Sequence, residues 1–265
     1  VLKDNTRNGL GHWSFNSSSF SFIQPLYTRV QGKAEYRNLS GYQAYDFAWK
    51  DEIVIPRQPK TSKVCFLGDS HSRESMDAFI RLNLTTNNIS VAHLWVGKLN
   101  EILADDRVSE RTKRQLTTCD VIIMAIGQWD VSHKAKKGPL SFAQYESNLE
   151  DVLDLLQKRV PYVPVRGRNI HFNGLGMYHT RCTPWDWRSP TVLRQLTTIV
   201  QRVFARRSND QFTYLDTSFV VEPMWDGAGD WSHLEKPVVA AETLFLVSEA
   251  LKLPLPTTNS SLQIE

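Results

Sequence analysis

Short apolar segments alternate with amphipathic segments from about residue 61 onward, and this alternation restricts the fold more than any other feature of the sequence. The run at 121–126, Val-Ile-Ile-Met-Ala-Ile, is apolar throughout, which is typical of a central parallel strand covered by helices on both faces. Strands are predicted at 63–67, 89–96, 121–126, 169–173 and 212–215. Helices are predicted at 72–82, within 104–116, and at 142–156, 190–204 and 238–251. Because strands that alternate with helices form right-handed crossovers, the sequence predicts an α/β fold with a doubly wound parallel sheet.

The first 60 residues differ from the rest because they show no regular apolar period. They nevertheless hold many aromatic side chains, among them Trp13, Phe20, Tyr27, Phe47 and Trp49, which are too many for a disordered tail. We therefore expect residues 1–60 to form an irregular, aromatic-rich arm packed on a main domain of residues 61–265. A length of 265 residues fits one such domain.

Composition and charge argue against two classes of partner. The net charge of +3 is not gathered into a dense Lys/Arg stripe among aromatic residues, so nucleic acid is not an expected partner. No apolar run approaches the length of a membrane span, so we expect no span within this chain. The chain begins at Val1 rather than Met, which fits the removal of a signal or anchor segment.

Sequons and cysteines point to different compartments. Three cysteines without close spacing predict neither a disulfide framework nor a zinc site. Cys65 and Cys119 lie in or beside predicted core strands, so we expect them to be buried thiols that pack as small hydrophobic side chains. Asn-x-Ser/Thr sequons instead favour the secretory pathway, in the Golgi lumen or outside the cell. They stand at Asn16, Asn38, Asn83, Asn88 and Asn259.

Two strings far apart in the chain hold the parts of an acyl-transfer site. Ser70 follows the predicted strand at 63–67 directly, in Gly-Asp-Ser, and Asp230 stands three residues before His233 in Asp-Trp-Ser-His. A serine hydroxyl is a poor nucleophile unless a base takes its proton, and a carboxylate orients such a base. The order Ser, Asp, His therefore predicts a catalytic triad of Ser70, Asp230 and His233. The alternative is that Ser70 only caps the following helix and that His233 is a surface residue.

The predicted sheet brings further loops to the same place, because ligands bind beyond the carboxyl ends of parallel strands. The oxyanion of an acyl transfer needs preorganised donors. We expect these from the backbone N–H groups of Ser70 and Gly97, the guanidinium of Arg73 and the side-chain amide of Gln128. Arg73 has an alternative role in a structural salt bridge.

Aromatic residues in these loops are candidates for sugar stacking. We expect Trp129, Tyr178, His179 and Trp231 to line the substrate site, whereas Trp185 and Trp187 fit core packing equally well. His71 is not expected to be the base, because neighbouring positions on a helix point apart. No HExxH, paired CxxC or acidic cluster indicates a metal. The remaining histidines are expected to be structural or surface residues; they are His12, His93, His133 and His171.

These strings resemble those of the SGNH/GDSL hydrolase superfamily, and within it the PC-esterase group that includes trichome-birefringence-like glycan O-acetyltransferases. The segment from Gly68 to Arg73 is similar to that group's GDS-x-x-R string, and Gly-Gln-Trp at 127–129 has Trp where the wider superfamily has Asn. Gly-His-Trp at 11–13, Pro-Leu-Tyr at 25–27 and Phe-Ala-Trp at 47–49 are loosely similar to its aromatic arm. The plant members carry several disulfides and a cysteine-rich C-terminal string that this chain lacks.

The resemblance implies a flavodoxin-like three-layer sandwich, Ser70, Asp230 and His233 as the triad, and Arg73 in the oxyanion hole. It implies acetyl transfer to a carbohydrate hydroxyl through an acetyl-serine, with no bound cofactor. Acetyl-CoA, or an acetylated carrier or sugar, would be the co-substrate. A membrane protein is one candidate partner that would supply this acetyl donor. Two other hypotheses stay open: an esterase in which water is the acceptor, and a catalytically idle glycan-binding module.

Overall fold

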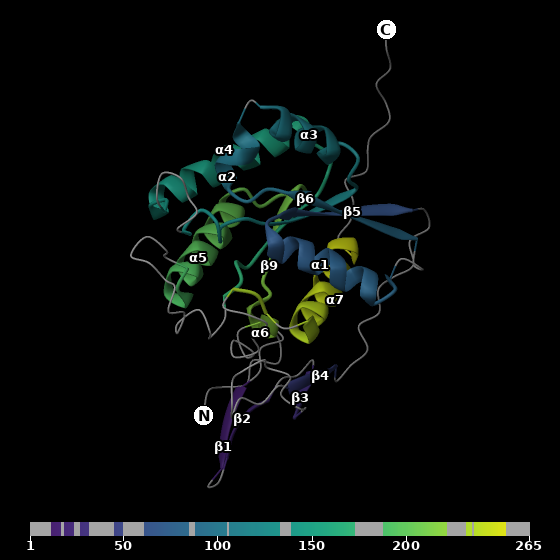
Figure 1. Ribbon diagram of the computed structural model, residues 1–265, viewed down its shortest axis with the longest axis vertical. Coiled ribbons are helices and arrows are strands. Elements are labelled where there is room, and N and C mark those ends of the chain that lie inside the picture. Colours follow the sequence, from purple (N-terminus) through teal and green to yellow (C-terminus); the bar gives the residue numbers. More distant parts are fainter. Residues whose placement is uncertain are drawn as a thin grey trace.

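The computed structural model describes residues 61–84, 88–104, 106–132, 139–172, 188–221, 232–234 and 236–252, together with four short strands before residue 61 (Figure 1). Its centre is a sheet of five parallel strands in the order β6-β5-β7-β8-β9. Numbered along the sheet, this is the 2-1-3-4-5 order of flavodoxin-like folds. The prediction of a doubly wound parallel sheet is confirmed. The strands are β5 (Ser62–Gly68), β6 (Ile89–Trp95), β7 (Val121–Ala125), β8 (Val165–Arg168) and β9 (Phe212–Leu215).

Helices cover both faces of this sheet (Figure 1). On one face lie α2 (Leu99–Leu103), α3 (Arg107–Leu116), α4 (Phe142–Arg159) and α5 (Pro190–Arg206). On the other lie α1 (Ser70–Arg81) and α7 (Lys236–Lys252), with the short α6 (Ser218–Val221) beside α7. Among the described helices, none combines the length and the apolar character needed to cross a membrane.

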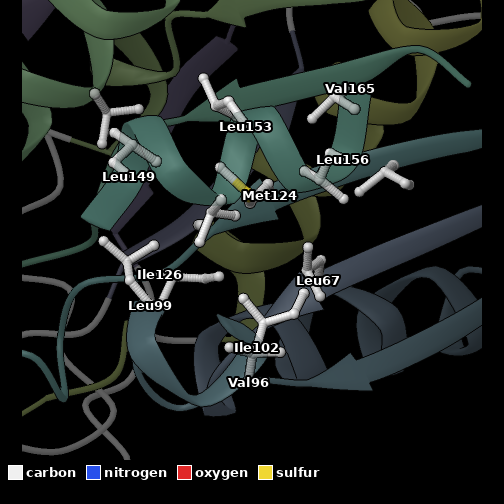
Figure 2. Close-up of a cluster of buried hydrophobic side chains, with 14 of the residues drawn as sticks. Leu67, Val96, Leu99, Ile102, Met124, Ile126, Leu149, Leu153, Leu156 and Val165 are labelled. Carbon is white, nitrogen blue, oxygen red and sulfur yellow. The ribbon is translucent and has the colours of Figure 1, made fainter. Parts of the chain in front are cut away.

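Alternation along the strands builds two cores from one sequence. On β5, Cys65 and Leu67 join the cluster under α4 and α5, whereas Val64 and Phe66 join the cluster under α1 and α7. Figure 2 shows the first cluster, in which Leu149, Leu153 and Leu156 of α4 approach the strands at spacings of three and four residues. Each fully buried aliphatic side chain contributes on the order of 2 kcal/mol. Helices therefore cover both faces of the sheet, and the loops that follow the strands form its carboxyl edge.

Two of the helices begin at a capping serine. Ser189 caps α5 by accepting from the Val192 N–H, with Pro190 in the first turn. Ser141 caps α4 in a capping box with Gln144. The polar helix predicted within 104–116 is confirmed as α3, and the short helix α2 before it was not predicted.

The fourth strand was predicted at the wrong place. It spans Val165–Arg168, and residues 169–172 after it are not in a strand. The sequence Val-Arg-Gly-Arg looks too polar for a central strand, yet Arg166 and Arg168 are both 1% exposed and hydrogen-bonded. The shift matters for the site, because it places residues 169–172 in the loop that follows the strand.

Cys65 and Cys119 were expected to be free thiols, and this prediction is wrong. The two form a disulfide with a Cα–Cα distance of 5.8 Å across a sequence separation of 54 residues. The reason is the sheet order: β7, which begins at Val121, pairs directly with β5, so the segment that leads into β7 is brought to the strand that carries Cys65. Spacing along the chain contains no trace of this pairing.

Four short strands lie in the first 60 residues and were not predicted. β1 (His12–Asn16) pairs with β2 (Ser19–Ile23), and β3 (Tyr27–Gln31) pairs with β4 (Tyr45–Trp49), each antiparallel. The division into an arm and a main domain stays a prediction.

Candidate active site

The turn between β5 and α1 presents Ser70 at the carboxyl edge of the sheet. Gly68 ends β5 with a φ of +153°, and a Cβ there would lie 2.2 Å from the Ala125 carbonyl oxygen and 2.4 Å from Ser72 Oγ. Only glycine fits this close approach of backbone to backbone. Asp69 then caps α1 by accepting from the His71 N–H at 3.0 Å, and Ser70 is the first residue of the helix.

The structure brings Ser70 and His233 together. His233 Nε2 lies 2.8 Å from Ser70 Oγ, although 163 positions separate them in the sequence. Both side chains are partly exposed, so the pair is reachable from outside. Asp230, the proposed orienting carboxylate, lies outside the described residues, as do Trp231, Tyr178 and His179.

The N-terminus of α1 also supplies a suitable field for an oxyanion. The first-turn N–H groups of a helix lack intrahelical acceptors, and the helix dipole favours negative charge at that end. The Ser70 N–H belongs to this first turn. Arg73 follows one turn later and is exposed, and its own N–H donates to the Asp69 carbonyl oxygen at 3.2 Å.

Two other expected oxyanion donors are already engaged. The Gly97 N–H donates to Glu101 Oε2 at 2.8 Å, because Glu101 reaches back to cap the start of α2. The Gln128 side-chain amide donates to the His171 carbonyl oxygen at 2.5 Å and so ties the loop after β7 to the loop after β8. Each of these groups thus makes a hydrogen bond within the protein, and their role as oxyanion donors stays a prediction.

Two buried carboxyl groups near the site have raised pKa values. Burial raises the pKa of Asp69 to about 6, although the His71 N–H and the charge of Arg168 oppose the shift. Burial likewise raises the pKa of Asp130 to about 8, opposed by the hydrogen bond from the Leu99 N–H. Asp130 is therefore mostly protonated at neutral pH, and it accepts a hydrogen bond from the N–H of Leu99, the first residue of α2.

Three histidines lie around Ser70: His71, which was expected not to be the base, and His93 and His171, which were expected to be structural or surface residues. His71 is buried, and its ring centroid is 4.6 Å from that of His233. His171 is also buried and reaches His71, with 3.3 Å between their Nδ1 atoms. His93 approaches the carbonyl oxygens of Gly68 and Asp69 at 3.0 and 3.1 Å. The position of His171 was missed from the sequence because the fourth strand was predicted at 169–173, which placed this residue inside the sheet.

Aromatic side chains lie at or after the carboxyl ends of β6 and β7, the two strands that flank β5. Trp95 ends β6 opposite Gly68 and is 43% exposed. Its ring meets that of Trp129 edge to face, with centroids 6.1 Å apart, and meets His93 at 5.9 Å. Trp129 was predicted from the sequence and Trp95 was not, although its place at the end of a predicted strand was a usable signal.

One cluster of described residues has the composition of a metal site. His71, Glu74 and His233 each offer one ligand atom, and these atoms lie within 4.8 Å of one another. However, both nitrogens of His71 contact other side chains, and His233 Nε2 contacts Ser70. A cation would have to compete with these contacts, so we assign no metal here.

Comparison with known proteins identifies the fold. No family model matches the chain, and no curated protein matches it. Among solved structures, a candidate GDSL-like lipase from Parabacteroides merdae ATCC 43184 matches with a TM-score of 0.51 at 12% identity, covering 77% of this chain and 100% of that one. An acetyl esterase mutant with an acetate ion matches with a TM-score of 0.53 at 11% identity, over 73% of this chain and 100% of that one.

A carbohydrate esterase of family 3 from Talaromyces cellulolyticus matches with a TM-score of 0.53 at 12% identity, over 72% of this chain and 98% of that one. Identities this low establish the fold alone. The chain therefore has the α/β fold of the GDSL-like lipases and carbohydrate esterases, the SGNH hydrolase fold that the motifs indicated.

Proposed function

We propose that this protein is a serine-dependent enzyme that moves acetyl groups on and off carbohydrate hydroxyls through an acetyl-serine. The observation that carries the proposal is the 2.8 Å contact between His233 Nε2 and Ser70 Oγ at the N-terminus of α1. Two structural neighbours, an acetyl esterase and a carbohydrate esterase, support the same chemistry.

In the first half-reaction Ser70 Oγ attacks the acetyl carbon while His233 Nε2 takes the hydroxyl proton. The tetrahedral oxyanion then lies at the amino end of α1, where the Ser70 N–H and the helix dipole stabilise it. Arg73 is proposed to add its guanidinium once substrate is bound. The intermediate collapses when the bond to the leaving oxygen breaks, and that oxygen receives the proton from His233.

In the second half-reaction a hydroxyl attacks the acetyl-serine and gives its proton to His233. The bond to Ser70 Oγ then breaks, and Ser70 Oγ takes that proton back from His233. Asp230 is proposed to hold the Nδ1–H of His233 and to steady the imidazolium that forms in both halves. With a sugar hydroxyl as acceptor the enzyme is an O-acetyltransferase, which the GDS-x-x-R and Gly-Gln-Trp strings favour. With water as acceptor it is an acetylesterase, which the esterase neighbours favour.

The sugar is proposed to stack on Trp129, with Tyr178, His179 and Trp231 completing the site. The acetyl donor is proposed to be acetyl-CoA, or an acetylated carrier or sugar delivered by a membrane partner. The disulfide supports an oxidising compartment, and the five sequons agree with it. We therefore propose the secretory pathway, either the Golgi lumen or the outside of the cell.

A fluorophosphonate probe tests the nucleophile. The wild type is expected to be labelled at Ser70, and Ser70→Ala is expected to lose labelling and to lose turnover of an acetylated chromogenic ester by about 10⁴-fold or more. Ser75→Ala is the matched control, because Ser75 lies in the same helix and donates only to the His71 carbonyl oxygen. Labelling of the wild type and Ser70→Ala to the same extent would leave a glycan-binding module without catalysis.

The acceptor is tested separately. The wild type is incubated with the same ester with and without acetyl-free oligosaccharides, and the sugars are analysed by mass spectrometry. Transfer predicts sugars that are heavier by one acetyl group, together with faster release of the leaving group. Release of acetate that no acceptor alters, with no acetylated sugar, identifies the esterase.

A further inference from the structure

His71 is a buried, titratable side chain next to the nucleophile that the proposed reaction does not use. It occupies the second position of α1 and is 3% exposed. Its ring packs on the ring of His233 with a tilt of 34°, and its Nε2 lies 3.3 Å from Ser232 Oγ. His71 therefore contacts Ser232 and His233, two of the three described residues at 232–234.

The other side of His71 leads to two further elements. His71 Nδ1 lies 3.3 Å from His171 Nδ1, and His171 Nε2 lies 2.7 Å from Glu242 Oε2. His171 belongs to the loop after β8 and Glu242 to α7, and both side chains are fully buried. A chain of contacts thus runs from Glu242 through His171 and His71 to Ser232.

The direction of the hydrogen bonds follows from the charge of Glu242. Burial alone would raise the pKa of Glu242, but the nearby Arg168 and His171 outweigh it and bring the pKa to about 2. The ionised carboxylate can only accept, so His171 Nε2 carries a hydrogen and its Nδ1 is an acceptor. Arg168 Nη1 lies 2.5 Å from the same His171 Nε2 and can only donate, so it competes with Glu242 for this nitrogen. The chain inferred below assigns the Nε2 hydrogen to the contact with Glu242, and Arg168 then acts through its charge on Glu242 at 3.4 Å.

The remaining links follow in order. His171 Nδ1 accepts, so the hydrogen of His71 stands on its Nδ1, and the lone pair of His71 Nε2 accepts from the Ser232 hydroxyl. Burial, together with the positive charge that His233 and His171 can carry, lowers the pKa of His71 well below its ordinary value. His71 is therefore neutral, and the imidazolium that forms at His233 during catalysis does not face a second permanent positive charge.

We propose that Glu242, His171 and His71 form a buried, one-directional hydrogen-bonded chain that positions the loop of His233 by holding the hydroxyl of Ser232. The three are positioning residues, and the inference rests on the proposed role of His233 as base. The physical reason is that a base acts only when it is held in the right geometry, and a misplacement of about 1 Å is enough to cost on the order of a hundredfold in rate.

Nuclear magnetic resonance tests the chain without any activity. Long-range nitrogen–proton correlation spectra of the wild type at pH 7.5 report the tautomer of each imidazole, and a His171→Gln sample assigns the His171 signals by their loss. The expected result is a neutral Nε2–H tautomer for His171 and a neutral Nδ1–H tautomer for His71. A His71 ring protonated on Nε2 overturns the proposal.

A matched pair of variants tests the positioning role. His171→Gln can still accept from His71 and donate to Glu242, whereas His171→Leu can do neither. The rate constant for labelling Ser70 and the kcat are expected to fall on the order of tenfold to a hundredfold in His171→Leu at unchanged KM, and to recover in His171→Gln. Equal losses in the two variants overturn the proposal.

The outcome separates the two hypotheses. If the wild type itself is not labelled, the proposed function fails, and the tautomers still decide whether the chain exists. If the wild type is labelled and the tautomers differ from those expected, the chain fails and the proposed function stands. A His171→Leu variant that does not fold leaves the wild-type spectra and the kinetics of His171→Gln to decide.

Discussion

The disulfide between Cys65 and Cys119 is expected to supply a large part of the stability of the described domain. It joins β5 to the start of β7 across 54 residues, and both cysteines are buried, at 0% and 4% exposure. In the chain-entropy model, a cross-link that closes a loop of this length destabilises the unfolded state by about 4 kcal/mol. For a protein of this size, that corresponds to roughly 8 to 16 °C in Tm.

Urea unfolding with and without a phosphine reductant measures this contribution. The reductant substitutes no residue and converts the cystine only into two thiols, so the difference in the free energy of unfolding reports the cross-link without the cavity that a substitution would leave. A Cys65→Ala, Cys119→Ala double variant is the matched control, and the reductant is expected to leave its unfolding unchanged. Cys182→Ala keeps the disulfide and is expected to lose stability on reduction as the wild type does.

A thiol titration in denaturant gives an independent check. The wild type is expected to show one reactive thiol before reduction and three after it, because the chain has three cysteines. Three thiols before reduction, together with equal unfolding midpoints in the two conditions, would refute the reasoning and would also remove the main support for an oxidising compartment.

Two further predictions concern the turn of the nucleophile and the buried carboxyl of Asp130. Gly68→Ala is expected to lose about 3 kcal/mol or more in urea unfolding, since its Cβ would meet the backbone oxygen of Ala125 at 2.2 Å. Gly97→Ala is its control: its Cβ would meet only the flexible end of Glu101, so an equal loss would contradict the argument. Because burial raises the pKa of Asp130 to about 8, the native state holds a proton that the unfolded state releases above its ordinary pKa of 3.8. Stability from this group is complete below that value and is lost as pH rises toward 8. The Tm of Asp130→Asn is therefore expected to gain on that of the wild type between pH 5 and 8; a gap that stays constant would show that Asp130 does not titrate in this window.

The local sequence pattern predicted the elements correctly where tertiary packing favours the same secondary structure. β9 spans the predicted residues, and β7 ends one residue before its prediction, because an apolar run with helices on both sides has few other solutions. The turn before Ser70 was also predictable, since a glycine between a buried strand and a helix allows a close approach of the backbone. The contact between Ser70 and His233 was predicted from chemistry, because the proposed reaction needs a serine and a base within hydrogen-bonding distance.

The buried charged residues could not be placed from the sequence, because their partners are remote along the chain. Arg168 in β8 and Glu242 in α7 look misplaced in apolar elements, and each is tolerated because the other lies beside it. A charged residue in a predicted core is itself a signal that a buried partner exists, but the sequence does not say which residue that is.

The sequence by itself thus determined the layers, the strand that leads to the nucleophile and the pair that the chemistry requires, because hydrophobic period and turn geometry act over a few neighbouring residues. Only the tertiary structure decided which cysteines join, which amides are already engaged and which histidines surround His233. Those contacts arise where loops from different strands converge at one sheet edge, and convergence is a property of strand order rather than of any local segment.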